Sequence, residues 1–251
     1  MNGKYLFLIL ILALGLSACS GTIQLPKFQP VGPLQVEDIL VPLPVEDGTA
    51  RLNLSFGAGT LLLHPGSAAL VSGTASYNVE ELKPVVTTEG LSASITQGEW
   101  KLKGIPSVGD IKNEWDLSLG SIPMDLDIEA GAYSGEFELG GLALRNLSVS
   151  DGAADVELSF SEPNTIEMTL FQYQTGASQV KLIGLANARF STMEFDSGAG
   201  NYTLDFSGTL QRDASVSIET GVSNITLVIP EGIPVQITVD GGLSNITHDS
   251  G

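Results

Sequence analysis

Cysteine is almost absent from this chain of 251 residues, in which Cys19 is the only one. Disulfide bonds, thiol catalysis and cysteine-ligated metal sites need thiols elsewhere in the chain, so the sequence excludes them. Histidine is nearly as scarce: there are only His64 and His248, and neither has partners at the spacing of a metal site or a catalytic triad. We therefore expect both histidines in surface loops, and we expect no catalytic residues, metal or cofactor.

Basic residues are also few. Lys and Arg together number 11 against 29 Asp and Glu, which gives a formal net charge of −18. Nucleic acid and anionic lipid headgroups repel such a chain, so neither is an expected partner, and the charge is explained more simply by solubility. The sequence contains no P-loop, no G-x-G-x-x-G and no G-x-S-x-G elbow, which removes the commonest signatures of nucleotide binding and acyl transfer.

Long hydrophobic runs are missing after the first 18 residues. Within those residues, Lys4 precedes an apolar stretch at 5–16 that is too short to span a bilayer comfortably. The stretch ends in Leu-Ser-Ala-Cys at 16–19, which resembles the bacterial lipobox. The resemblance implies that 1–18 is a signal peptide and that Cys19 is acylated, so that the protein is extracytoplasmic and lipid-anchored to a bacterial membrane. The alternative is an ordinary signal peptide with a cysteine at its cleavage site.

The rest of the chain divides into three parts by composition. Residues 19–49 contain five prolines and little apolar periodicity, which predicts a semi-extended tether with a strand-like piece at 36–41. Residues 50–123 begin with a unit around Gly57 and then lose regular spacing, which predicts an atypical N-terminal cap. Residues 124–251 form a regular array of repeats.

In that array, a glycine recurs every 21 to 24 residues with an apolar pair five and three residues before it. The corner glycines are Gly131, Gly152, Gly176, Gly198, Gly221 and Gly242. The pairs are Leu126/Ile128, Leu147/Val149, Phe171/Tyr173, Met193/Phe195, Val216/Ile218 and Ile237/Val239. A fixed period in this range is typical of stacked-strand arrays, and the alternation turns each pair inward. The sequence predicts an all-β, solenoid-like stack with two short strands per unit, joined at a glycine corner, and very little helix.

Two rows of polar residues follow from stacking in register. Three residues after each glycine lie Ser134, Asp155, Gln179, Asn201, Asn224 and Asn245, which predicts a structural polar ladder. Two residues before each glycine lie Glu129, Ser150, Gln174, Asp196, Glu219 and Asp240, which predicts an acidic stripe. Asp196, Glu219 and Asp240 are weak candidates for a calcium site, because calcium prefers oxygen ligands. A solvated acidic face is the commoner explanation.

Several stretches resemble the toast-rack family of bacterial envelope proteins. They are SGTASYNV at 72–79, KNEWDL at 112–117, PMDLD at 123–127 and much of 198–230, and the likeness extends over about 50–251. The resemblance implies a stacked all-β body related to the C-terminal domain of proteins that respond to cell-wall-active antibiotics. It brings no catalytic residues with it.

The sequence leaves three functions open. The leading hypothesis is a lipid-anchored, non-catalytic envelope protein, adhesin-like, whose stacked surface binds an envelope protein or a cell-wall component or acts as a scaffold. The alternative is a regulator of envelope stress that modulates a membrane sensor kinase. The third is an enzyme acting on polysaccharides, for which Arg145, Arg189 and Arg212 in return loops are a weak indication.

Overall fold

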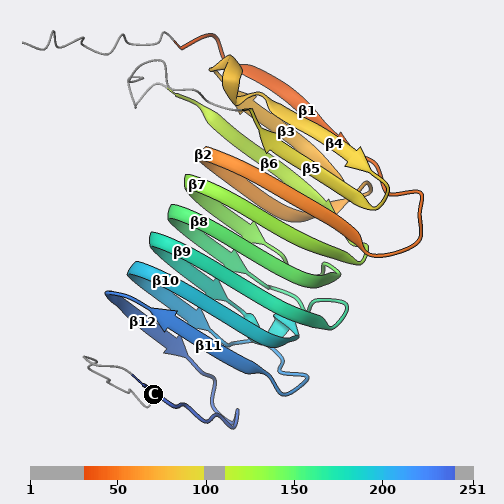
Figure 1. Cartoon of the computed structure of the whole chain (residues 1–251). Coiled ribbons are helices and arrows are strands. Elements are labelled where there is room, and N and C mark those ends of the chain that lie inside the picture. The colour runs from red at the N-terminus through yellow and green to blue at the C-terminus, as the bar shows by residue number, and fades with distance from the viewer. Residues whose placement is uncertain (1–30, 99–110, 241–251) are drawn as a thin grey trace, which may run out of the picture.

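Figure 1 shows the computed structural model, which describes residues 31–98 and 111–240. These residues form one open sheet of 12 strands and two short 3₁₀ turns, so the predicted all-β fold is confirmed. The strands are β1 (Gln35–Val41), β2 (Ala50–Ser67), β3 (Val71–Tyr77), β4 (Pro84–Glu89), β5 (Ser92–Gln97), β6 (Asn113–Gly120), β7 (Met124–Glu138), β8 (Leu144–Ser159), β9 (Met168–Ile183), β10 (Phe190–Asp205), β11 (Ser215–Thr220) and β12 (Ser223–Val228). The 3₁₀ turns are η1 (Glu80–Leu82) and η2 (Leu185–Ala188). No helix within the described ranges is long and apolar enough to cross a membrane.

The body of the molecule is a stack of five long parallel strands: β2, β7, β8, β9 and β10. In Figure 1 each of these ribbons folds back on itself, so that its first half lies in one layer and its second half in the other. Apolar side chains alternate along both halves and point between the layers, where they form one continuous core. Each bent strand with its connecting loop is one rung of the stack.

The prediction of two short strands per unit is wrong for β7 to β10, because each is a single strand that continues through its corner. The backbones of successive rungs remain in register there: Ala132 lies opposite Ala153 across β7 and β8, and Ala177 lies opposite Ala199 across β9 and β10. Hydrogen bonding along the stack therefore need not stop at the bend. Only the last described rung has two separate strands, β11 and β12, which flank Gly221.

The corner glycines are needed for close packing along the stack. None of the five described ones has a positive φ, so conformational freedom does not explain them. Instead, Gly57, Gly131, Gly152, Gly176, Gly198 and Gly221 lie directly above one another in a column. A Cβ at Gly176 or Gly198 would collide with the carbonyl oxygen of the glycine in the preceding rung, whereas at Gly152 it would lie 3.1 Å from that of Gly131. The remaining predicted corner, Gly242, lies outside the described residues.

The N-terminal end of the stack is closed by a cap. Strands β1, β3 and β6 pair antiparallel and continue the second half of β2, while β4 and β5 continue its first half. Trp115 of β6 is fully buried, with its ring centroid 5.0 Å from that of Phe56. Strand β1 confirms the strand-like piece predicted at 36–41, but it is not part of a separate tether: Ile39 and Val41 are buried, so the folded body includes residues before 50.

The C-terminal end of the array departs from the prediction. Ile237 and Val239, expected as an inward pair, belong to no strand and are 57% and 56% exposed. Pro230 and Pro234 precede them, and proline cannot donate a hydrogen bond to a neighbouring strand. Among residues 31–98 and 111–240, the stack therefore ends at β11 and β12.

Candidate functional site

The outer surfaces of the two layers carry polar side chains in straight rows. We call the outward residues before the corners the leading face and those after the corners the trailing face. One leading-face row is Asn53, Asp127, Ser148, Gln172, Glu194 and Ser217. One trailing-face row is Thr60, Ser134, Asp155, Gln179, Asn201 and Asn224. The predicted polar ladder is thus confirmed up to Asn224, whose Nδ2 donates to Asn201 Oδ1 at 3.1 Å; Asn245 lies outside the described residues.

The predicted acidic stripe forms, but it does not gather three carboxylates. Asp196 and Glu219 are neighbours in register on β10 and β11, and Gln174 donates to Asp196 at 3.4 Å. Asp240 lies beyond the last described strand. Within the described part of the chain, no group of three or more His, Cys, Asp or Glu side chains could hold a metal ion. The three calcium candidates are therefore not brought together in this structure.

His64 is exposed, as expected, but it lies within β2 and not in a loop. Its Nε2 is 2.9 Å from Asp116 Oδ1 on the neighbouring strand β6, and both side chains are about half exposed. A solvated pair of this kind contributes little stability. His248 lies outside the described residues.

The three arginines expected in return loops hold neighbouring rungs together, but only Arg189 and Arg212 lie in loops, since Arg145 belongs to β8. Arg145, the second residue of β8, donates two hydrogen bonds to the carboxylate of Asp125, through Nε at 2.9 Å and Nη2 at 2.5 Å. Burial of Asp125 opposes its ionisation, but the hydrogen bonds from Arg145 and Asn146 outweigh this effect and lower its pKa. The charge of Arg145 is therefore already neutralised by Asp125 in the same stack.

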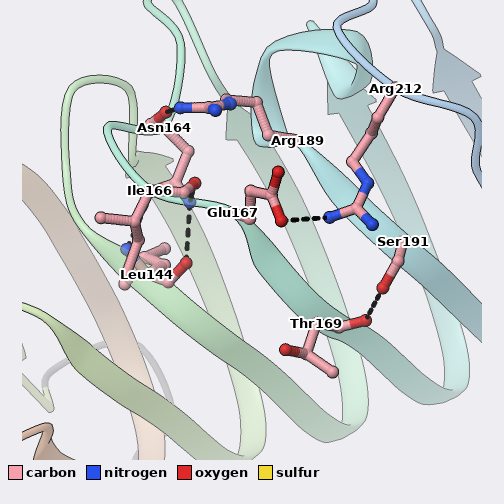
Figure 2. A network of polar contacts seen from close by, with 8 residues as sticks. All are labelled: Leu144, Asn164, Ile166, Glu167, Thr169, Arg189, Ser191 and Arg212. Atoms are coloured by element: carbon pink, nitrogen blue, oxygen red, sulfur yellow. Dashed lines mark hydrogen bonds and ion pairs between the residues drawn. The ribbon is translucent and has the colours of Figure 1, made fainter.

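Figure 2 shows the other two arginines in a network that links successive loops. Arg212 donates to Glu167 at 3.1 Å, and Arg189 donates to the carbonyl oxygen of Asn164 at 3.0 Å. Arg189 has a φ of 58° and is the only described non-glycine residue with a positive φ. This backbone conformation costs energy and persists only where surrounding contacts enforce it. The network thus fixes the geometry of the loops.

Asn164 is the buried centre of this loop network. It is 0% exposed, and its side chain accepts from the amide of Leu144 and donates to the carbonyl oxygens of Leu144 and Ile166 at 2.7–2.9 Å. We expect Asn164→Ala to lower the free energy of unfolding by about 1–3 kcal/mol, because it leaves buried backbone groups without partners. Chemical denaturation measures the change. Asn224→Ala, on the exposed ladder, is the matched control and should stay within about 0.5 kcal/mol of wild type; equal losses would contradict the assignment.

The most concentrated polar cluster surrounds the buried carboxylate of Asp151, which is 9% exposed. Asp151 precedes the corner of β8, and the adjacent rungs contribute four hydroxyl groups. Thr175 and Tyr173 donate to it at 2.5 and 2.9 Å, and the hydroxyls of Tyr133 and Ser178 each lie 3.4 Å away. The arrangement locks three neighbouring rungs, β7, β8 and β9, together at the bend.

Burial raises the pKa of Asp151, although the hydrogen bonds from Thr175 and Tyr173 oppose the shift. Burial also raises the pKa of Tyr173 and of Tyr133, so both remain donors. Two surface cavities of about 350 Å³ lie elsewhere, one around Phe56 and Gln97 and one around Arg51 and Leu91. Asp151 lines neither of them, and its hydrogen-bond partners all lie at the bend, so its cluster supports the corner.

The repeat pattern does not single out Asp151, because this residue lies between the acidic stripe and the corner glycine. The same position in the other rungs holds Ala130, Thr175, Ser197 and Thr220. The other residues of this row are small or carry a hydroxyl group, so Asp151 is the one carboxylate in it. Aligning the repeats reveals this exception at an inward corner. Treating this row as buried would have marked Asp151 as the centre of a buried polar cluster.

The comparisons with known proteins agree with this geometry. The model of the N-terminal domain of toast-rack proteins, DUF2154, matches residues 31–182 and, in a second match, residues 163–228. A crystal structure described as a putative cell adhesion protein from Clostridium sporogenes is 23% identical, with a TM-score of 0.61, over 78% of this chain and 99% of its own. One described as a putative adhesin from Bacteroides fragilis is 12% identical, with a TM-score of 0.38, over 80% of this chain and 100% of its own.

The second likeness is too distant to carry an argument, and the first shows the fold alone. No curated protein matches the chain. The family model, however, covers more than half of the sequence and includes the cap, the bent strands and the last described rung. The expected resemblance is thus confirmed, and the chain belongs to the toast-rack family.

Proposed function

We propose that this protein is a lipid-anchored, non-catalytic component of the bacterial cell envelope that binds another envelope component through its stacked β surface, in the manner of an adhesin. The observation that carries the proposal is the pair of ordered faces, on which polar rows run in register across the long strands and on to β11 or β12. Such rows present the same spacing, about 4.8 Å, over the length of the stack.

The chemistry of the described side chains supports a binding role over a catalytic one. Arg145 and Arg212 are paired with acids of the stack, and Asp151 is enclosed by hydroxyl groups. The description of the C. sporogenes protein as a putative cell adhesion protein is in keeping with this role. Acylation of Cys19 would attach the body to the membrane through the segment that precedes β1.

Charge reversal on one face at a time tests the proposal. Glu136→Lys with Asp155→Lys alters the trailing face, and Glu129→Lys with Glu219→Lys alters the leading face; all four side chains are exposed. Each pair changes the net charge by the same amount. We expect one pair, and not the other, to reduce binding of the purified protein to whole cells or isolated peptidoglycan by at least tenfold.

The controls separate binding from anchoring. Cys19→Ser should release the protein from the membrane fraction while leaving its affinity for the target unchanged. Equal loss from both charge-reversal pairs would mean that net charge alone governs binding. A wild-type protein that retains no cell-wall or protein component would overturn the proposal.

A further inference from the structure

The two ends of the stack are not equivalent. At the N-terminal end, the cap buries the inward residues of β2, among them Leu54 and Leu61 at 0% exposure. At the C-terminal end, the inward residues lose their cover from one rung to the next. Met193 of β10 is 0% exposed, whereas Val216, its partner in register on β11, is 37% exposed. Leu204 and Leu227 of β12 differ in the same way, at 0% and 37%.

The backbone is also open at this end. β10 pairs with β9 on one side and with β11 and β12 on the other, but within the described residues no strand pairs with the outer edge of β11 or β12. An uncovered edge with apolar side chains beside it is a template for another strand. Of the 12 residues in β11 and β12, Glu219 alone is charged, so this edge is nearly neutral in a strongly acidic protein.

The chain carries a segment whose sequence fits that edge. Residues 236–247 repeat the pattern of 215–226 at an interval of 21, and Ser-Asn-Ile-Thr occurs at both 223–226 and 244–247. Ile237 and Val239 correspond to Val216 and Ile218, the inward residues of β11. In the structure Ile237 and Val239 are more than half exposed and form no strand, so no described part of the chain buries them.

The connection has the length that a further rung needs. The loops after β7, β8, β9 and β10 contain 5, 8, 6 and 9 residues. From the end of β12 at Val228 to residue 236 there are seven, within that range. A segment of the same chain can therefore reach the start of the next rung by the same kind of connection.

We propose that residues 236–247 dock in parallel on the outer edge of β11 and β12 as a detachable final rung. Docking covers Val216 and Leu227, and it pairs Ser217 with Thr238 and Glu219 with Asp240. Asp240 then lies next to Glu219, which is itself next to Asp196, and repulsion among the three carboxylates favours release. This inference does not depend on the proposed function.

A cysteine pair tests the docked register. In the Cys19→Ser chain, Ser217→Cys with Thr238→Cys places two outward side chains one rung apart, about 4.8 Å between Cα atoms and within disulfide range. Ser217→Cys with Val239→Cys is the matched control, because a shift of one residue turns the second side chain inward. We expect mild oxidation to form an intramolecular disulfide at least fivefold more in the first pair, identified by mass spectrometry of the linked peptides.

Equal yields in the two pairs, or no disulfide in either, would overturn the proposal. Disulfide-linked dimers whose yield rises with protein concentration would show that a second copy occupies the edge, which also overturns it. A second readout uses the chain without new cysteines. Val239→Asp should lower the melting temperature by several degrees, whereas Thr238→Asp, which adds the same charge on the outward side, should not; equal melting temperatures would count against docking.

Discussion

Gly198→Val is expected to abolish cooperative unfolding or to lower the free energy of unfolding by more than about 4 kcal/mol, a loss that few single substitutions cause. Gly198 is exposed to solvent, so its degree of burial does not predict this large loss of stability. The obstacle lies along the stack axis, where a Cβ would collide with the carbonyl oxygen of Gly176. Relief requires separating two rungs at the bend, which breaks strand pairing on both sides of the corner.

Gly152→Ala is the matched control for this prediction. Its added Cβ would lie 3.1 Å from the carbonyl oxygen of Gly131, a distance that a small shift of the neighbouring backbone relieves. We expect a loss of about 1 kcal/mol or less. Thermal and urea denaturation should show the largest loss in free energy of unfolding for Gly198→Val, a smaller loss for Gly198→Ala and the smallest for Gly152→Ala. A Gly198→Val protein with the wild-type melting temperature would disprove the packing role of the column.

Asp151→Ala is expected to lower the free energy of unfolding by about 2–4 kcal/mol. The variant removes the common acceptor of Thr175 and Tyr173 inside the stack, and buried donors without partners are costly. Denaturation in urea at neutral pH measures the loss. Asp151→Asn keeps one acceptor oxygen and removes the charge, so we expect a smaller loss than for alanine.

The pH dependence of Asp151→Asn supplies a second test of the same cluster. Because burial raises the pKa of Asp151 above its ordinary value of 3.8, the folded protein binds this proton at a higher pH than the unfolded chain does. Wild type should therefore gain stability relative to Asp151→Asn as the pH falls through the folded pKa, with no further relative gain below 3.8. Parallel stability curves for the two proteins between pH 4 and 7 would contradict the buried, partnered state of this carboxylate.

Much of the stack could be predicted from the sequence because its repeats are short and regular. The glycine interval and the alternating pairs, such as Leu147 with Val149, identify inward positions without knowledge of the fold. Register follows from the same interval, which is why the ladder up to Asn224 was predicted residue by residue. Fold class, inward faces and polar rows all depend on local periodicity, and local periodicity is visible in one sequence.

What could not be predicted depends on contacts between distant segments. The strand-like piece at 36–41 is predicted from the sequence, but only the pairing of β1 with β3 assigns Ile39 to the core and not to a tether. The continuity of strands through the corner depends on the neighbouring rungs, which a single repeat does not reveal. The Asp151 cluster likewise needs hydroxyl groups from β7 and β9 to meet across β8. In each case the deciding partner lies about 20 or more residues away.

The column of corner glycines also limits how this molecule can change in size. A connecting loop can gain or lose a few residues, since the loops between rungs already vary from 5 to 9. The bend has no such freedom, because each glycine contacts the one beneath it. Length should therefore be added or removed in whole units of about 22 residues, each of which changes the height of the body by about 4.8 Å. Members of different height could thus keep the same cap and the same terminal edge while placing that edge at a different distance from the cap.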